Sequence, residues 1–337
     1  MFRKISICVA LSAIAAFAQT KPSFEVATIK PAAPLDQAKI LAALQGGGKL
    51  PVGATVDAHR AEYLYLDLKT LMTYAYGVKP YQISGPDWMT ATRFDIVAKL
   101  PDGSVKSDAS KMLQSLLEDR FKLTFHRTTG EHQVLALVAA GKNGLKLKTS
   151  AATPVAIDEN APLKPGELKT EGPEGLVKTS VDLKNGSSVV DMGLKGKMAY
   201  HVDPATQSIH IDFSMMTMGG LADMLTQLFT QIGGPTGGGR QVVDMTGIQG
   251  NYDATIEISL LDILAMARNA GVDLGANLPN GPAGGNGGGP AGGGASDPGG
   301  GSSMMDAVKS MGLKLESRKA PVDQFVIDHL EKMPTEN

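Results

Sequence analysis

Apolar residues recur at helical spacing in four segments of the chain. Positions i, i+3, i+4 and i+7 fall on one face of an α-helix, so an apolar stripe at this spacing predicts an amphipathic helix. The four stripes run over Leu68–Ala75, Ala109–Leu117, Leu221–Leu228 and Met304–Met311. The expected capping residues are Asp67, Ser107 and Ser303 at the helix starts, and Gly77 and Gly312 at the ends.

Strand-like segments between these helices occur in matching pairs. The pairs are Arg93–Ala98 with Asn251–Ile256, Phe121–Thr124 with Leu313–Glu316, and Val134–Leu135 with Val326–Ile327. Their offsets are 158, 192 and 192 residues. Each half of the chain then reads strand, helix, strand, helix and a two-stranded hairpin. We therefore predict an internal repeat and an α+β fold of two related β-α-β-α-β-β modules, with the helices packed on small mixed sheets.

The expected organisation is a first module over residues 19–148, a polar linker over 149–175 and a second module over 176–337. Residues 270–303 are dominated by Gly, Pro, Asn and Ser. Such a segment cannot bury enough apolar surface to offset the entropy of ordering it. We interpret it as a flexible Gly-rich loop inserted in the second module, which accounts for the rise in offset from 158 to 192 residues.

Residues 1–18 have the pattern of a secretory signal peptide. Arg3 and Lys4 form a basic start, Ile5–Phe17 is an apolar run, and Ala16–Ala18 fits the small-x-small cleavage rule. The alternative is a membrane anchor, but the apolar run is shorter than the roughly 20 residues that span a bilayer. We expect cleavage before Gln19 and a secreted or periplasmic protein without a transmembrane segment.

Removal of this segment also changes the chemistry of the chain. The only cysteine, Cys8, lies in it, so the mature protein would have no disulfides, thiolate metal ligands or cysteine nucleophiles. Loss of Arg3 and Lys4 lowers the count of Lys and Arg from 32 to 30, against 34 Asp and Glu. Because nucleic-acid-binding proteins usually carry a strong basic excess, we expect no nucleic-acid partner.

Several patterns suggest bound phosphate or metal, but each has a simpler structural interpretation. Gly233–Arg240 is glycine-rich but lacks the Gly-Lys-Ser/Thr ending of a phosphate-binding loop. The possible metal-ligand groups are His126 with His132 across a predicted hairpin, and His201 with Asp203, His210 and Asp212. Zinc sites need three or four ligands in tight geometry, usually at recognisable spacing. We interpret both groups as surface residues and predict no metal and no cofactor.

A hydrolase site is the remaining catalytic possibility. The sequence has neither a Gly-x-Ser-x-Gly elbow nor a Ser-x-x-Lys pair, although a triad of distant residues stays open. The acids Asp87, Asp95, Asp244 and Asp253 lie beside expected strand ends. They could pair as in glycoside hydrolases, but Asp is also a common turn residue. We assign no catalytic residue.

Trp88 is the only tryptophan and follows the first predicted helix, near Tyr74, Tyr76 and Tyr81 in sequence. If exposed, this aromatic group would stack on a sugar or hold a peptide. If buried, it would close the core of the first half. Tyr81, Asp87 and Trp88 are our candidate binding residues.

Several strings, in this order, carry a family resemblance. They are Phe24–Pro31, Gly85–Trp88, Asp119–Leu123, Val243–Gly247, Tyr252–Asp253, Leu313–Glu316, Ala320–Val322 and Val326–His329. Together they resemble a secreted "soil-associated" family expanded in acidobacteria. The resemblance implies no known activity, substrate or catalytic residue. Some members look to be fused to a membrane sensor metallopeptidase of the β-lactam-sensor type, which implies a ligand-sensing or interaction role. The short helix–strand units also resemble the short N-terminal domain of secretins and TonB.

These observations predict an exported, non-enzymatic module of the cell envelope that binds a ligand or a protein. The expected partner is an envelope protein or an extracellular ligand of unknown identity. The two halves would enclose a groove between them or offer sheet edges to a partner strand. The alternatives are a secreted hydrolase with an unrecognised active site and a structural part of a larger envelope assembly.

Overall fold

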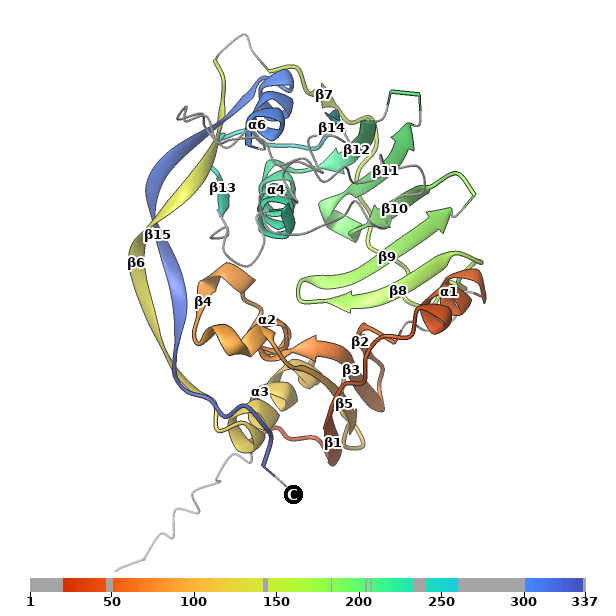
Figure 1. Ribbon diagram of the computed structural model, residues 1–337, viewed down its shortest axis with the longest axis vertical. Helices are drawn as coiled ribbons and strands as arrows, with labels where there is room; N and C mark the ends of the chain where they lie inside the picture. Colours follow the sequence, from red (N-terminus) through yellow and green to blue (C-terminus); the bar gives the residue numbers. More distant parts are fainter. Residues whose placement is uncertain are drawn as a thin grey trace, which may run out of the picture.

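A computed structural model describes residues 21–46, 51–141, 145–182, 184–203, 205–206, 208–232, 241–259 and 301–335. The predicted signal peptide, and residues 270–300 of the predicted Gly-rich loop, lie outside the described residues. The described part is mostly β-structure, with eleven strands in one sheet and four in another (Figure 1). The expected fold class, α+β with helices on small mixed sheets, is therefore wrong.

The larger sheet joins the two halves of the chain. In sheet order its strands are β1 (Val26–Pro31), β5 (Arg93–Lys99), β3 (Arg60–Asp67), β2 (Gly53–Val56), β8 (Glu167–Gly172), β9 (Gly175–Asp182), β10 (Ser187–Asp191), β11 (Lys197–Asp203), β12 (Ser208–Met216), β14 (Tyr252–Ser259) and β7 (Lys148–Thr149). All its described pairs are antiparallel. β8 lies in the range expected to be a linker and pairs with β2 through Glu171 and Ala54.

The second sheet is built on two long strands that run along one side of the molecule (Figure 1). Among the described residues its order is β13 (Val242–Asp244), β6 (Thr124–Ala139), β15 (Leu313–His329) and β4 (Ile83–Ser84). β6 and β15 pair antiparallel, and the short β13 and β4 add to them in parallel. The expected hairpins are wrong, because Gly130 continues β6 and pairs with Val322 of β15. One long ladder satisfies backbone groups that two separate hairpins would leave at their edges.

The described helices include all four that the apolar stripes predict. These are α2 (Leu68–Tyr76), α3 (Asp108–Arg120), α4 (Met218–Ile232) and α6 (Gly301–Ser310), joined by the unexpected α1 (Gln37–Gly46). Asp67 caps α2 as expected by accepting from the Thr70 N–H at 2.7 Å, and Gly77 ends it at φ 64°. Ser107 makes no side-chain cap at α3. No helix in the described part of the chain could cross a membrane.

Each helix pair organises its own hydrophobic core, but the long strands serve both cores. α2 and α3 bury their apolar faces in the first core, and α4 and α6 in the second. β6 contributes Phe125 to the first core and Leu137 to the second, while β15 contributes Phe325 and Leu313 in the same way. Neither helix pair therefore closes its core alone, since each core includes residues of both long strands.

The strands that precede α2 and α4 carry the same irregularity. The register of β3 against β5 shifts next to Tyr65, and that of β12 against β14 shifts next to Met215. Both residues have positive φ, 57° and 58° respectively. Non-glycine residues avoid this conformation unless their surroundings hold them in it. The chain therefore builds two bulges of one kind, each directly before a core helix.

Candidate functional site

Four charged side chains from four separate segments meet near the centre of the molecule. We call Lys79, Glu174, Lys195 and Asp223 the charge cluster. Asp223 lies 2.8 Å from the Lys79 ammonium and 3.7 Å from that of Lys195. Glu174 forms ion pairs with the same two ammonium groups. Each carboxylate thus serves both lysines, and the side chains keep 28–39% of their surface exposed.

Lys79 and Asp223 are placed by the two helices that face each other across the cluster. Lys79 follows the left-handed end of α2 at Gly77 and caps the short helix η1 (Pro80–Gln82). Its backbone N–H donates to the Gln82 side chain at 2.9 Å, which fixes the chain at this point. Asp223 lies on α4, whose apolar stripe is buried in the second core. The cluster therefore spans the two cores.

Glu174 and Lys195 come from tight connections that depend on glycine. Glu174 lies in the two-residue turn between β8 and β9, next to Gly175 at φ 118°. Lys195 ends the short helix η3 (Gly193–Lys195). A Cβ on the following Gly196 would lie 2.7 Å from the Met215 carbonyl oxygen. Only glycine allows this approach, so the bulge in β12 directly supports the segment that presents Lys195.

The electrostatics of the cluster reflect two lysines held close together. Burial lowers the pKa of Lys195, the charge of Lys79 lowers it further, and Asp223 acts in the opposite direction. Burial also raises the pKa of Tyr81, and the charges of Lys79 and Asp223 act on the same phenol in opposite directions. Tyr81, a predicted binding residue, therefore lies within electrostatic reach of the cluster.

The other two predicted binding residues lie elsewhere. Both belong to the short helix η2 (Asp87–Thr90). Trp88 is half-buried against the first core, and the Lys332 ammonium lies 5.4 Å from the centre of its ring. Asp87 is exposed. Tyr81 instead packs against the small cluster of Val134, Ala320 and Val322. The structure thus gives Tyr81 and Trp88 different surroundings.

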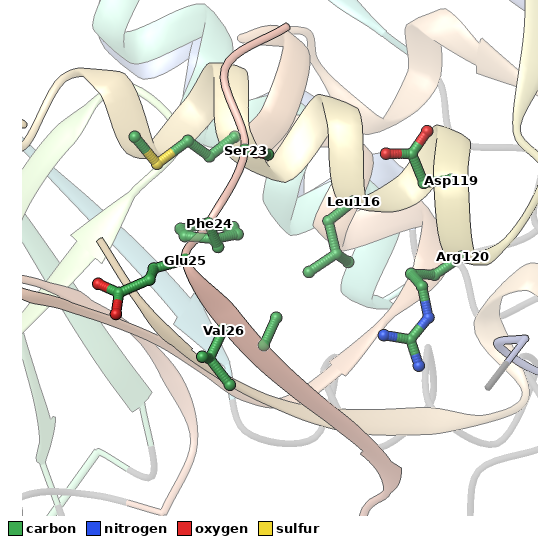
Figure 2. A pocket seen from close by; sticks show the side chains of 9 residues that line it. Ser23, Phe24, Glu25, Val26, Leu116, Asp119 and Arg120 are labelled. Carbon is green, nitrogen blue, oxygen red and sulfur yellow. The ribbon is translucent and has the colours of Figure 1, made fainter. Parts of the chain in front are cut away.

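A hollow of about 350 Å³ between β1 and α3 is the second candidate site. Figure 2 shows Phe24, Glu25 and Val26 on one side of it and α3 with Leu116, Asp119 and Arg120 on the other. The charged side chains at its rim bind to other residues of the protein. The Arg120 Nε donates to the Thr335 carbonyl oxygen at 2.6 Å, and Glu25 pairs with Lys99 at 2.8 Å. Asp119 likewise lies 3.6 Å from the Lys21 ammonium, so the charged side chains around the hollow already have partners in the protein.

The histidines that could have bound metal are distributed along strands. His126 and His132 both lie on β6, where His126 approaches Asp328 at 2.8 Å and His132 approaches Gln324 at 3.4 Å. The rings of His201 and His210 stack at 4.9 Å across β11 and β12. Within the described ranges, no group of three or more His, Cys, Asp and Glu side chains is arranged to hold a metal ion. The glycine-rich residues 233–240 lie outside the described residues.

Three of the acids considered for a hydrolase site accept hydrogen bonds from backbone N–H groups. Asp244 accepts from the Thr246 N–H at 2.9 Å in a turn. Asp95 and Asp253 each accept from a backbone N–H at 3.0 Å. Asp244 therefore acts as a turn residue, whereas Asp95 and Asp253 each bond to the backbone of the neighbouring strand.

None of the four cluster residues was among the sequence candidates. Glu174, Lys195 and Asp223 are single charges among many, without a motif or a spacing that distinguishes them. The signal that could have drawn attention to them is indirect: Gly172 and Gly175 flank Glu174, and Gly196 follows Lys195. Glycines on either side of a charged residue indicate a tight turn, but they do not show which turns lie close together in the folded protein.

Comparison with known families assigns the chain to one of them. The model of a family described as "Protein of unknown function (DUF3738)" matches residues 69–330, which is more than half of the chain. The protein therefore belongs to this family. No curated protein matches the sequence significantly, and no solved structure matches it either.

Proposed function

We propose that the protein is an exported, non-enzymatic binding module of the cell envelope, which holds a ligand or a partner protein at the charge cluster. The observation that carries the proposal is the convergence of four charged side chains from four segments at the boundary between the two cores. Such a set can exchange its internal ion pairs for pairs with a bound molecule.

The partial exposure of the charge cluster favours the exchange of its internal ion pairs for ion pairs with a bound molecule. Its side chains keep about a third of their surface in contact with solvent. Ion pairs at this level of exposure typically contribute at most about 1 kcal/mol each, so opening them costs little. A bound group that replaced them with charge-assisted hydrogen bonds would recover at least as much.

The position of the cluster supports a role in sensing. Lys79 follows α2 of the first core and Asp223 lies on α4 of the second core. Ligand sites occur preferentially where two structural units meet. A molecule bound here would contact both halves and favour one relative position of the two. That is the property a sensing or interaction module needs.

Export is part of the proposal. The signal-like residues 1–18 support a secreted or periplasmic location. The likeness of the chain to the secreted "soil-associated" acidobacterial family supports the same location. An envelope protein or an extracellular ligand is the partner that this location provides.

We also infer that the two halves derive from a duplication. The support is the matched pair of bulges at Tyr65 and Met215, each followed by a core helix. The connection after α2 supplies a cation, Lys79, and the equivalent helix α4 supplies an anion, Asp223.

The proposal is tested by affinity capture with three forms of the mature chain, residues 19–337. The wild type is compared with the variant Lys79→Gln/Lys195→Gln. The matched control is Lys99→Gln/Lys309→Gln, which removes two exposed lysines outside the charge cluster, paired with Glu25 and Asp306. Each form is immobilised and exposed to envelope extract and spent medium, and bound molecules are quantified by mass spectrometry.

We expect a defined molecule to be retained by the wild type and the control and to be lost from the cluster variant. If all three forms retained the same amount of the bound molecule, the charge cluster would not be its binding site. Chemical conversion of the retained molecule by the wild type would replace a binding function with an enzymatic one.

A further inference from the structure

Glu174 differs from the other members of the charge cluster in how it is held. It lies at the tip of the β8–β9 hairpin, in a turn of only Pro173 and Glu174 between the paired Gly172 and Gly175. Figure 1 shows this tip pointing toward the space between α2 and α4. The carboxylate of Glu174 therefore reaches the two lysines from outside both cores, as a separate molecule would.

The rest of the cluster is fixed by the fold. Lys79 is anchored through its backbone to Gln82, and Lys195 is presented by the loop that packs on β12. Asp223 lies on α4 and offsets one of the two positive charges. Without Glu174, the remaining three side chains would carry a net charge of +1. They would form a preformed site for one anionic group.

The backbone of the hairpin is held up to Glu171, one residue before Gly172 and the turn. The Tyr74 hydroxyl donates to the backbone carbonyl oxygen of Glu171 at 2.8 Å, and Glu171 pairs with Ala54 of β2. Beyond this point come Gly172 and Gly175, the latter with positive φ, so the turn can change conformation while β8 and β9 remain paired.

We propose that Lys79 and Lys195 form a binding site for a carboxylate group, that Glu174 occupies this site in cis, and that a carboxylate-bearing ligand takes its place. The inference rests on the proposed binding function and specifies its ligand class and its regulation. The Glu174 carboxylate is itself the model for the bound group, because it contacts both ammonium donors at once. Such charge-assisted contacts to a carboxylate are short and strong.

Two further features suit a carboxylate ligand. The lysines repel each other, since Lys79 acts to lower the pKa of Lys195, so an empty site is unfavourable and an anion is favoured. The phenol of Tyr81 lies within electrostatic reach of the charge cluster, and its ring packs against the apolar side chains of Val134, Ala320 and Val322. A small acid with an apolar body, such as the C-terminus of a peptide, matches this combination.

The experiment measures binding of N-acetyl-L-alanine to the mature protein by NMR titration in low-salt buffer, with N-acetyl-L-alaninamide as the uncharged probe. Glu174→Gln retains the shape of the side chain but removes its charge. Glu171→Gln is the matched control. It removes one negative charge from the same hairpin, but the Glu171 carboxylate pairs with Lys106 and not with the lysines of the charge cluster. Thermal unfolding of each variant verifies that it is folded.

We expect Glu174→Gln to bind the acid about tenfold more tightly than the wild type, because an internal occupant present in about nine of ten molecules lowers apparent affinity by that factor. Glu171→Gln should match the wild type, the amide probe should not bind, and adding Lys79→Gln to Glu174→Gln should abolish the gain. Equal affinity of Glu174→Gln and the wild type would overturn the inference, as would an equal gain in Glu171→Gln.

The two proposals fail in different ways. If Glu174→Gln gains nothing but capture from envelope extract still depends on Lys79 and Lys195, occupancy in cis is wrong and the binding function stands. If capture is also independent of the two lysines, the binding function falls with it.

Discussion

The carboxylate of Asp253 accepts a hydrogen bond from the backbone N–H of Met215, at 3.0 Å. Asp95 makes the same bond to the N–H of Tyr65, also at 3.0 Å. In both cases the donor is the positive-φ residue of a bulge, where the strand ladder leaves the N–H without a backbone partner. One aspartate on the neighbouring strand therefore stabilises each bulge. In the second half, that bulge also supports the loop carrying Lys195.

The first prediction concerns these two aspartates. Asp95→Ala and Asp253→Ala should each lower the free energy of unfolding by about 1–3 kcal/mol, the typical cost of a part-buried donor left without an acceptor. Asp95→Asn and Asp253→Asn keep an acceptor oxygen and should lose less. Urea denaturation followed by circular dichroism measures the effect. The exposed Asp102→Ala is the control, and losses no larger than its own would contradict this role of the bulge contacts.

A second prediction concerns Gly85, in the connection between β4 and η2. A Cβ at this position would lie 2.6 Å from the Met89 sulfur and 2.8 Å from Cγ1 of Ile327. Met89 can adjust, but Ile327 lies on β15 within the long ladder and cannot move freely. Gly85→Ala should therefore destabilise the protein by about 1–3 kcal/mol, as overpacking does.

Thermal and urea unfolding measure the loss, with Gly219→Ala as the control. Gly219 lies near the start of α4 and has open space at its Cβ position, so alanine should be neutral or stabilising there. Adding Ile327→Val to Gly85→Ala should recover part of the lost stability. No recovery would mean that the Ile327 contact is not the cause.

The helices were predictable because their signals are local. The stripe Leu68–Ala75 and its caps lie within one short segment, and the structure confirms both the cap at Asp67 and the end at Gly77. Ser107 is the N-cap residue of α3, as expected, but its side chain makes no capping bond. Its backbone is itself helical, at φ −65° and ψ −16°, and the Ala109 N–H donates to the Lys106 carbonyl oxygen at 3.2 Å instead. The turn before the helix thus takes over a donor that a cap would serve, which the sequence alone does not show.

The sheets and the site were not predictable because their partners are distant. Two hairpins were expected where β6 and β15 each continue, since an alternating strand looks the same whether its partner is adjacent or far away. Lys79 and Asp223 are 144 positions apart, and each resembles an ordinary surface charge until the fold brings them to 2.8 Å. Tyr81 was a candidate as an aromatic residue, but its position beside these charges depends on the same long-range pairing.

A third prediction concerns Thr226, which joins α4 to β13. Its buried hydroxyl accepts from the Val242 N–H at 2.9 Å and donates to the Ala222 carbonyl oxygen at 2.9 Å. Thr226→Val preserves the shape but leaves the Val242 N–H without this acceptor. We expect a loss of about 1–3 kcal/mol in the free energy of unfolding. Thr226→Ser keeps the hydroxyl and should retain more stability than Thr226→Val in urea denaturation. The opposite order would contradict the assignment.

The last prediction links the hairpin that carries Glu174 to stability at high pH. Burial raises the pKa of Tyr74 to about 12, and the nearby Glu171 carboxylate acts in the same direction. The unfolded chain has the lower tyrosine pKa, near 10, so it releases this proton first as pH rises. The contribution of Tyr74 is thus complete below pH about 10 and is lost between about 10 and 12. Unfolding free energies measured across this range should fall with pH, and Tyr74→Phe should reduce the slope.

At pH 7 the variant should be about 1 kcal/mol less stable, because its hydrogen bond to the Glu171 carbonyl is gone. If the fall of the unfolding free energy with pH were the same in Tyr74→Phe and the wild type, Tyr74 would not contact the hairpin as a buried, neutral phenol.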